Sequence, residues 1–346
     1  MGLNEKFFKT SAVDDTPNFA PTIWTGNDTA RNISTGFAPD FVWIKSRTAA
    51  RNHYLYDSIR GVNNQLLTNA TSAQANIGER LTAFNSDSFR IGTSAEVNNA
   101  STEKYVGWAW KGGGSSVQNN DGSINGANCL VSANVAAGFS IIKWRGNGTN
   151  SATIGHGLDS APELIIHKGL TNPTSWVIGI GGISGFSASD YLQFNTAAKS
   201  NSSTFFQGYG SSTFTVGVSS ANEMNKNSSN YYIGYAFHSV DGYSKIGSYV
   251  GGGTTDVPIT LGFTPAFVMI KSSTYSPSGW IMYDNKRQTG TGAYENYTVL
   301  FAETAQVEST DNVVRGIQFN SNGFIANQNY EHTNDSGDTY IYLAIA

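Results

Sequence analysis

The sequence carries little charge and almost no cysteine. Charged residues make up 13% of its 346 residues, about half of the share of roughly 25% that is usual in soluble domains, and the formal net charge is −4. No run of Lys and Arg occurs, so we expect no nucleic-acid partner. Cys129 is the only cysteine, which excludes a disulfide framework and a cysteine-ligated zinc site. No apolar stretch approaches about 20 residues, so we expect no membrane insertion.

What the chain has in quantity is aromatic residues, glycine and small polar residues. Aromatic residues make up 12% of the sequence, and 38 residues are Gly. A disordered chain usually has few aromatic residues and a high net charge, so this composition indicates folded cores. Asn, Ser, Thr and Gly favour turns, and aromatic residues favour strands. The composition therefore predicts an all-β protein.

A Pro–Lys motif occurs three times, with Pro six residues before Lys and a mostly apolar run between them. A continuous apolar run is typical of a strand that is buried on both faces, and proline at its entrance removes no needed donor. We expect each Lys to mark the exit of its strand into water. The three pairs are Pro39 and Lys45, Pro162 and Lys168, and Pro265 and Lys271.

Two further motifs accompany each Pro–Lys motif in the same order. An opening motif places an aromatic strand end before a turn rich in Gly or Asn, at residues 23–28, 143–148 and 248–253. A closing motif has Tyr first, Ala fifth and apolar residues second, fourth and sixth, which is the period of a strand. In the three copies of this motif, the Tyr and Ala are Tyr105 and Ala109, Tyr232 and Ala236, and Tyr340 and Ala344.

The motifs divide the chain into three related units of about 100 residues. We predict an N-terminal arm over residues 1–18, a first segment over 19–112, a Gly/Ser/Asn-rich linker over 113–136, a second segment over 137–240 and a third over 241–346. Short strands separated by regular turns predict tandem antiparallel β-sandwiches of the jelly-roll or concanavalin-like kind. The sequence leaves open whether each segment is a separate sandwich or shares strands with its neighbour.

A search for catalytic motifs nominates no catalytic residue, metal ligand or cofactor. The five histidines are not paired at metal-binding spacing, and no nucleophile elbow or phosphate loop occurs. A glycosidase needs two carboxylates at a set separation, and no pair stands out. We therefore expect a protein that is not an enzyme.

Aromatic residues are the remaining candidates for a binding site, because their rings can stack on sugars. Core packing explains Trp108 and Trp110, whose counterparts in the other closing motifs are also apolar. The residues that break the repeat are the predicted glycan or receptor contacts: Trp176, Tyr191, Phe205, Phe206, Tyr209 and Tyr275. In the N-terminal arm, Phe7 and Phe8 form a predicted assembly anchor for a neighbouring subunit, the alternative being that the arm folds back onto the first segment.

Residues 36–45, 51–61, 105–111, 121–124 and 137–141 together resemble a domain of virion proteins from marine tailed phages, especially cyanophages. The resemblance covers residues 19–250 well and the third segment more loosely. Such proteins are described as tail-fibre, structural or lectin/glucanase-like. The resemblance implies a concanavalin-like sandwich and a place on the outside of a virion, and it supplies no catalytic residues.

Three functions follow as alternatives. The first is a non-enzymatic tail fibre or tail-attached appendage that contacts host surface glycans. The second is a capsid decoration protein, and the third is an enzyme that degrades envelope polysaccharide. In the first two cases the expected partners are other virion proteins, bound through the N-terminal arm, and further copies of the chain. A cleft with two nearby carboxylates would favour the enzyme.

Overall fold

The computed structural model describes residues 17–100, 102–288, 298–309, 316–328 and 330–346. Their regular secondary structure is almost entirely antiparallel strand, which confirms the prediction of an all-β sandwich fold. The predicted anchor residues Phe7 and Phe8 of the arm lie outside the described residues.

The first segment forms a six-stranded sheet and a three-stranded sheet. The large sheet has the order β1-β9-β3-β4-β5-β6, and the small sheet has the order β2-β8-β7. Their bounds are β1 (Phe19–Thr25), β2 (Arg31–Ser34), β3 (Phe41–Ser46), β4 (Tyr54–Asp57), β5 (Asn64–Leu67), β6 (Ala75–Asn76), β7 (Leu81–Phe84), β8 (Ser88–Ile91), the single-turn helix α1 (Ala95–Asn98) and β9 (Lys104–Trp110).

The second segment has the same two layers, with two added strands. Its sheets have the orders β10-β11-β12-β20-β14-β15-β16-β17 and β13-β19-β18. The bounds are β10 (Val117–Asn119), β11 (Gly126–Asn134), a 3-10 turn (Val135–Ala137), β12 (Phe139–Arg145), β13 (Ala152–Gly155), β14 (Leu164–Gly169), β15 (Val177–Ile180), β16 (Asp190–Gln193), β17 (Ser200–Asn201), β18 (Phe206–Tyr209), β19 (Thr213–Val216) and β20 (Tyr231–Phe237).

The third segment again pairs a large sheet, β21-β28-β23-β24-β25, with a small one, β22-β27-β26. The bounds are β21 (Ser244–Val250), β22 (Val257–Thr260), β23 (Phe267–Ser272), β24 (Ile281–Asp284), β25 (Leu300–Phe301), β26 (Ile317–Asn320), β27 (Gly323–Ala326), the single-turn helix α2 (Glu331–Asn334) and β28 (Thr339–Ile345). In all three large sheets the closing strand therefore lies between the opening strand and the Pro–Lys strand.

The prediction of a linker over residues 113–136 is wrong, because this stretch contains β10 and β11. β11 pairs with β12 from Cys129 to Asn134, and β10 pairs in turn with β11. Leu130 and Val131 stand opposite Lys143 and Ile142, so this stretch continues the strand alternation of the sheet. The abundant Gly and Asn residues supply the turns between these strands, which is why the composition resembled that of a linker.

The Pro–Lys strands are buried on both faces because each separates two cores. In β3, Phe41 and Trp43 belong to a core that is shared by all three segments. Val42 and Ile44, which alternate with them, pack in the first segment's own core between its two sheets. β14 and β23 begin two residues after Pro162 and Pro265, just as β3 begins two residues after Pro39. The apolar run thus reflects two-sided burial, as its composition predicted.

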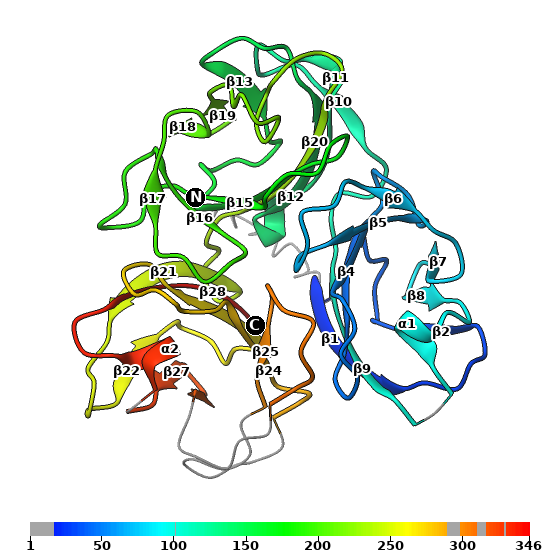
Figure 1. The fold of residues 1–346 in the computed structure, drawn as a ribbon, viewed down its shortest axis with the longest axis vertical. Coiled ribbons are helices and arrows are strands. Elements are labelled where there is room, and N and C mark those ends of the chain that lie inside the picture. The colour runs from blue at the N-terminus through cyan, green and yellow to red at the C-terminus, as the bar shows by residue number, and fades with distance from the viewer. Residues whose placement is uncertain (1–16, 101, 289–297, 310–315, 329) are drawn as a thin grey trace, which may run out of the picture.

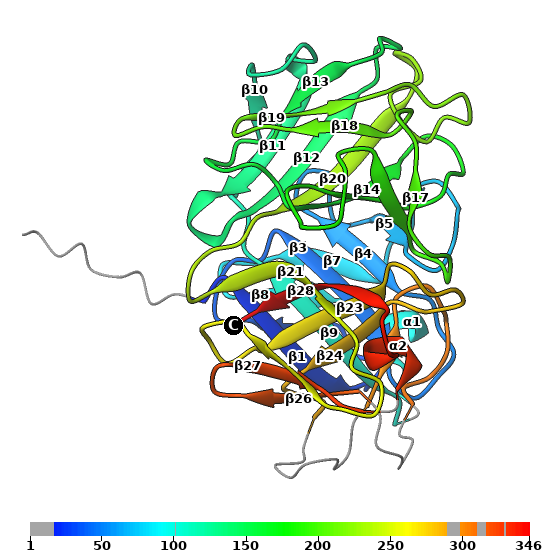
Figure 2. The ribbon, with the colours of Figure 1, turned by 90° about the vertical axis from the view of Figure 1, so that its left-hand side faces the viewer.

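The shared core holds the three segments together. Figure 1 shows their strands as three groups around a common centre, the first in blue, the second in green and the third in yellow to red. Figure 2 shows from the side how the green group lies against the other two. The second and third segments also have cores of their own, between their large and small sheets. Each segment is thus a small sandwich whose large sheet faces the other two.

The opening and closing motifs meet in an aromatic stack. The ring centroids of Trp24 and Tyr105 are 5.6 Å apart, those of Trp144 and Tyr232 are 5.6 Å apart, and those of Tyr249 and Tyr340 are 5.1 Å apart. Each Tyr hydroxyl also accepts a hydrogen bond from a backbone N–H that follows a buried Asn, at Asn99, Lys226 and Asp335. A phenol combines a large apolar ring with a polar tip, so Tyr meets both requirements at this position.

Candidate functional site

The three motif lysines lie at the junctions between segments and are fully buried, so the prediction that they reach water is wrong. The ammonium of Lys168 donates to the carbonyl oxygen of Thr71 in the first segment at 2.9 Å, and that of Lys45 donates to Ala305 O in the third at 3.3 Å. Lys271 donates to Ser278 O. Burial lowers the pKa of each of the three ammonium groups to about 8.

Backbone hydrogen bonds close the three junctions into a ring. At each junction a backbone N–H donates to the carbonyl oxygen of the residue two positions after a motif lysine. The bonds are Gln74 N to Leu170 O at 3.0 Å, Lys199 N to Ser273 O at 2.8 Å and Glu308 N to Arg47 O at 2.8 Å. The first segment thus binds the second, the second binds the third and the third binds the first.

Two buried Asp–Arg pairs form polar contacts across the junctions. Asp57 and Arg60 pair in the first segment, and Asp284 and Arg287 in the third, with all four side chains fully buried. Tyr235 of the second segment donates to Asp57 Oδ2 at 2.8 Å, and Trp108 Nε1 of the first donates to Asp284 Oδ2 at 3.0 Å. No sequence motif described above indicated these polar contacts.

Most of the predicted aromatic contacts are core residues. Trp176 is 3% exposed and borders a cavity of about 440 Å³ at the junction of the first two segments, where its Nε1 donates to Leu67 O at 2.7 Å. Phe205 and Phe206 pack in the second segment's own core. These three rings are covered by neighbouring residues, which leaves no free ring face for a sugar.

The other three predicted contacts are partly exposed and do not converge. Tyr191 packs edge-on against Phe205, with ring centroids 4.6 Å apart. Tyr275 lies in the loop after β23, where its backbone N–H donates to Ser272 Oγ at 2.9 Å. Tyr209 lines a pocket of about 280 Å³ near the junction of the second and third segments.

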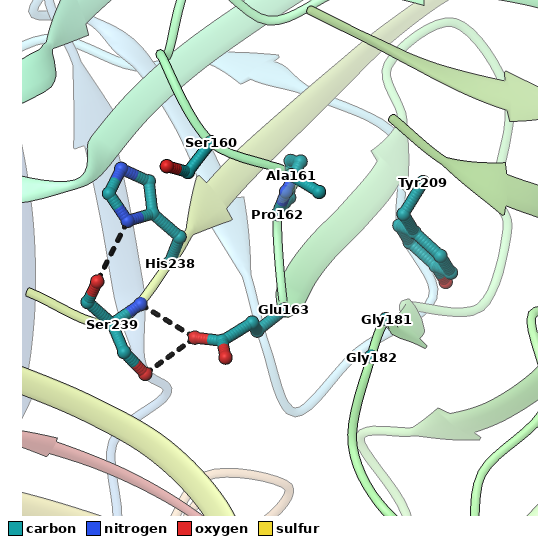
Figure 3. Close-up of a pocket in the computed structure, with 9 residues that line it drawn as sticks. All are labelled: Ser160, Ala161, Pro162, Glu163, Gly181, Gly182, Tyr209, His238 and Ser239. Atoms are coloured by element: carbon teal, nitrogen blue, oxygen red, sulfur yellow. Dashed lines mark hydrogen bonds between the residues drawn. The ribbon is translucent and has the colours of Figure 1, made fainter. Parts of the chain in front are cut away.

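The pocket that Tyr209 lines combines a carboxylate, an imidazole and three hydroxyl groups (Figure 3). Glu163 Oε2 accepts from the backbone N–H of Ser239 at 2.6 Å and from its hydroxyl at 2.5 Å. His238 lies with Nδ1 2.9 Å from the carbonyl oxygen of Ser239 and Nε2 3.3 Å from Asp159. The pocket is lined by Ser160, Ala161, Pro162, Glu163, Gly181, Gly182, Tyr209, His238 and Ser239.

These contacts give the Glu163 carboxylate a structural task. Ser239 begins the connection from the second segment to the third, and its Oγ also accepts from the N–H of Ile246 at 3.0 Å in β21. Glu163 therefore ties the entrance of β14 to this connection. The imidazole of His238 contacts the carbonyl of Ser239 rather than its hydroxyl, so the two side chains are not arranged as a general base and a nucleophile.

Comparison with known proteins gives a family for the chain. In the described part of the chain, no helix is long and apolar enough to span a membrane. No curated protein and no solved structure matches the sequence. The model of one family, the domain of unknown function DUF7483, matches residues 14–346. Because the match covers nearly the whole chain, the protein belongs to the DUF7483 family.

Proposed function

We propose that this chain is a non-enzymatic structural protein of a phage particle, a tail fibre or a tail-attached appendage that contacts glycans of the host surface. The observation that carries the proposal is the closure of three β-sandwiches around one shared core. Together with the resemblance to phage virion domains, this architecture supports a rigid body on the outside of a virion.

The buried titratable groups support a structural role. Strongly displaced pKa values often mark active sites, but ion-pair networks displace them too. Here the three motif lysines and the arginines of the two Asp–Arg pairs have no exposed side-chain surface and bind across or beside the junctions. A substrate in solution would not reach these groups. Their chemistry holds the segments together instead.

Capsid decoration is a second candidate, favoured by the arrangement in Figure 1. Three similar strand groups around a common centre match the symmetry of a threefold or quasi-threefold site on a shell. A tail position does not require this match in a single chain. The two candidates share a structural role and differ in the place of attachment.

Competition for host cells tests the proposed contact with the host. Purified protein is added to host cells before the phage, and unadsorbed particles are counted. We expect the protein to slow adsorption in proportion to its concentration, while heat-unfolded protein has no effect. Normal adsorption at saturating protein would contradict the host contact. In parallel, release of saccharide products from isolated envelope glycans would contradict the non-enzymatic role.

A further inference from the structure

The added strands of the second segment help to build a pocket that the sequence motifs did not indicate. It has a volume of about 270 Å³ and lies where the β10–β11 connection meets the turn after β12. Drug-sized ligands usually occupy pockets of about 300–1,000 Å³, so this one suits a single small ring. It is lined by Ser123, Ile124, Asn125, Asn128, Arg145, Gly146, Asn147 and Ser228, none of which is acidic.

Arg145 is the only charged residue of the lining and is held in place by the protein. Its Nε donates to the carbonyl oxygen of Ser228, and its terminal nitrogens have no hydrogen bond to the described residues. A guanidinium that is fixed through Nε can still offer its outer N–H groups to an anion. Carboxylate and sulfate oxygens fit such groups with two parallel hydrogen bonds.

An exposed aromatic ring lies beside this arginine. Tyr231 lies directly opposite Arg145 in the pairing of β12 with β20. Tyr231 is 42% exposed. The guanidinium carbon of Arg145 lies 5.9 Å from the ring centroid, and Lys143 Nζ lies 5.8 Å from it. A partly exposed ring offers contact area to the apolar face of a sugar.

Amide groups complete the donor set. Asn147 Oδ1 accepts from Thr149 N at 2.9 Å and from Asn225 Nδ2 at 3.0 Å. The protein therefore already uses this acceptor, whereas the exposed amide N–H groups of Asn147 have no partner among the described residues. Asn128 adds a second exposed amide from the neighbouring strand β11. Amides and hydroxyls of this kind bind sugar hydroxyl groups.

The corresponding positions of the other segments lack this combination. The cross-strand pair of Arg145 and Tyr231 corresponds to Thr25 and Lys104 in the first segment. In the third segment the corresponding pair is Val250 and Thr339. The first and third large sheets also have no counterpart of β10 and β11, as far as the described residues show. The three segments share the fold at this place, so the fold itself does not require arginine and tyrosine here.

We propose that Arg145, Asn128, Asn147 and Tyr231 form a binding site for an anionic saccharide, one that carries a carboxylate or a sulfate. The inference rests on the proposed function, because it names the class of host glycan that the particle would contact. Arg145 would bind the anionic group, the two amides the hydroxyl groups, and Tyr231 the ring.

Calorimetric titration of the full chain tests this site. The probes are tetragalacturonic acid with its neutral methyl ester, and a sulfated galactan tetrasaccharide with its desulfated form. We expect at least one acidic probe to bind about tenfold more tightly than its neutral partner, because charge-assisted bonds to Arg145 are lost in the latter. The acidic probe that binds shows whether the anionic group is a carboxylate or a sulfate.

Variants separate this site from a general effect of charge. We expect Arg145→Gln to weaken binding of the acidic probe about tenfold, and Tyr231→Ala to weaken it about fivefold. Lys104→Gln, which removes an exposed cation at the equivalent place of the first segment, should leave the affinity unchanged. Equal affinities of wild type and Arg145→Gln, or failure of both acidic probes to bind the wild type, would overturn the site. Either failure would leave the location of the chain on the particle unaffected, so the structural role is tested separately.

Discussion

The phenol of Tyr235 donates a hydrogen bond of 2.8 Å to the carboxylate of Asp57, a residue 178 positions earlier in the chain. The same place at the next junction has Trp108 donating to Asp284. At the remaining junction the corresponding residues are Ile180 and Leu343, both buried in the shared core. Two junctions thus pair an acid with a hydrogen-bond donor, and the corresponding positions at the third are both apolar.

Removing the hydroxyl of Tyr235 should lower the free energy of unfolding without changing the arrangement of the three segments. Tyr235→Phe leaves Asp57 with one donor fewer in a buried site, which costs about 1–3 kcal/mol. Urea unfolding of the variant should show this decrease in the free energy of unfolding. As a control, Tyr231→Phe changes an exposed phenol and should stay within about 0.5 kcal/mol of wild type. Equal stability of the two variants would contradict the role of the Tyr235–Asp57 bond.

Because the third junction has apolar residues at these positions, we expect that Asp57, Arg60 and Tyr235 can be replaced together by apolar residues. Asp57→Ile alone leaves Arg60 buried without its partner and should cost about 3–5 kcal/mol. Adding Arg60→Ile and Tyr235→Leu reproduces the residue types of Ile180, Ile183 and Leu343, and should restore most of this loss. Thermal unfolding of the single and triple variants measures the difference. A triple variant no more stable than Asp57→Ile would show that the three places are not interchangeable.

The buried lysines predict that stability rises with pH above about 8. The folded-state pKa of Lys168 is about 8, below its ordinary value of 10.5, so between these values the unfolded chain binds more protons than the folded one. The free energy of unfolding should therefore increase from pH 8 toward pH 10, by about 2 kcal/mol for each such lysine.

Urea unfolding at a series of pH values from 8 to 9.5 measures this slope. Tyrosine ionisation in the unfolded chain opposes the effect at higher pH, because burial raises the pKa of phenols such as Tyr342, to about 12. Lys168→Met should reduce the slope by about a third, since it removes one of three similar groups. Lys104→Met, at an exposed position, should leave the slope unchanged. The same slope in both variants would contradict the assignment of this pH dependence to the buried lysines.

The last strand should be indispensable. β28 lies between β21 and β23 and places Tyr340, Ile341, Leu343 and Ile345 in buried positions. Deleting residues 340–346 removes these side chains, each of which stabilises the fold by about 1.5–3 kcal/mol when fully buried, and exposes the edges of two strands. We expect insoluble protein. A truncated chain that remains soluble and melts at the wild-type temperature would contradict this.

Local features of the sequence predicted the strands well. The Pro–Lys run indicated two-sided burial, and β3, β14 and β23 each begin two residues after the motif proline. The aromatic positions of the opening and closing motifs also lie together, as in the stack of Trp24 on Tyr105. Such patterns depend on neighbouring residues and on the strand period, both of which can be read from one segment alone.

The environment of individual side chains could not be read in this way. Lys168 lies one residue before the end of β14, but its ammonium binds Thr71 of the first segment, 97 positions away. Trp176 is likewise covered at a junction, so a departure from the repeat did not mean exposure. The proposed saccharide site was missed because it joins Arg145 and Tyr231 to residues of the stretch expected to be a linker.

A cryo-electron microscopy map of the intact particle that carries this protein tests the central proposal most directly. Three strand groups around one core give a body that is recognisable at moderate resolution. We expect this body on the tail, in repeated copies, with the chain traceable through all three segments. The same body on the capsid shell would support decoration in place of a tail role. Purified, infectious particles that contain no copy of the chain would contradict the structural role altogether.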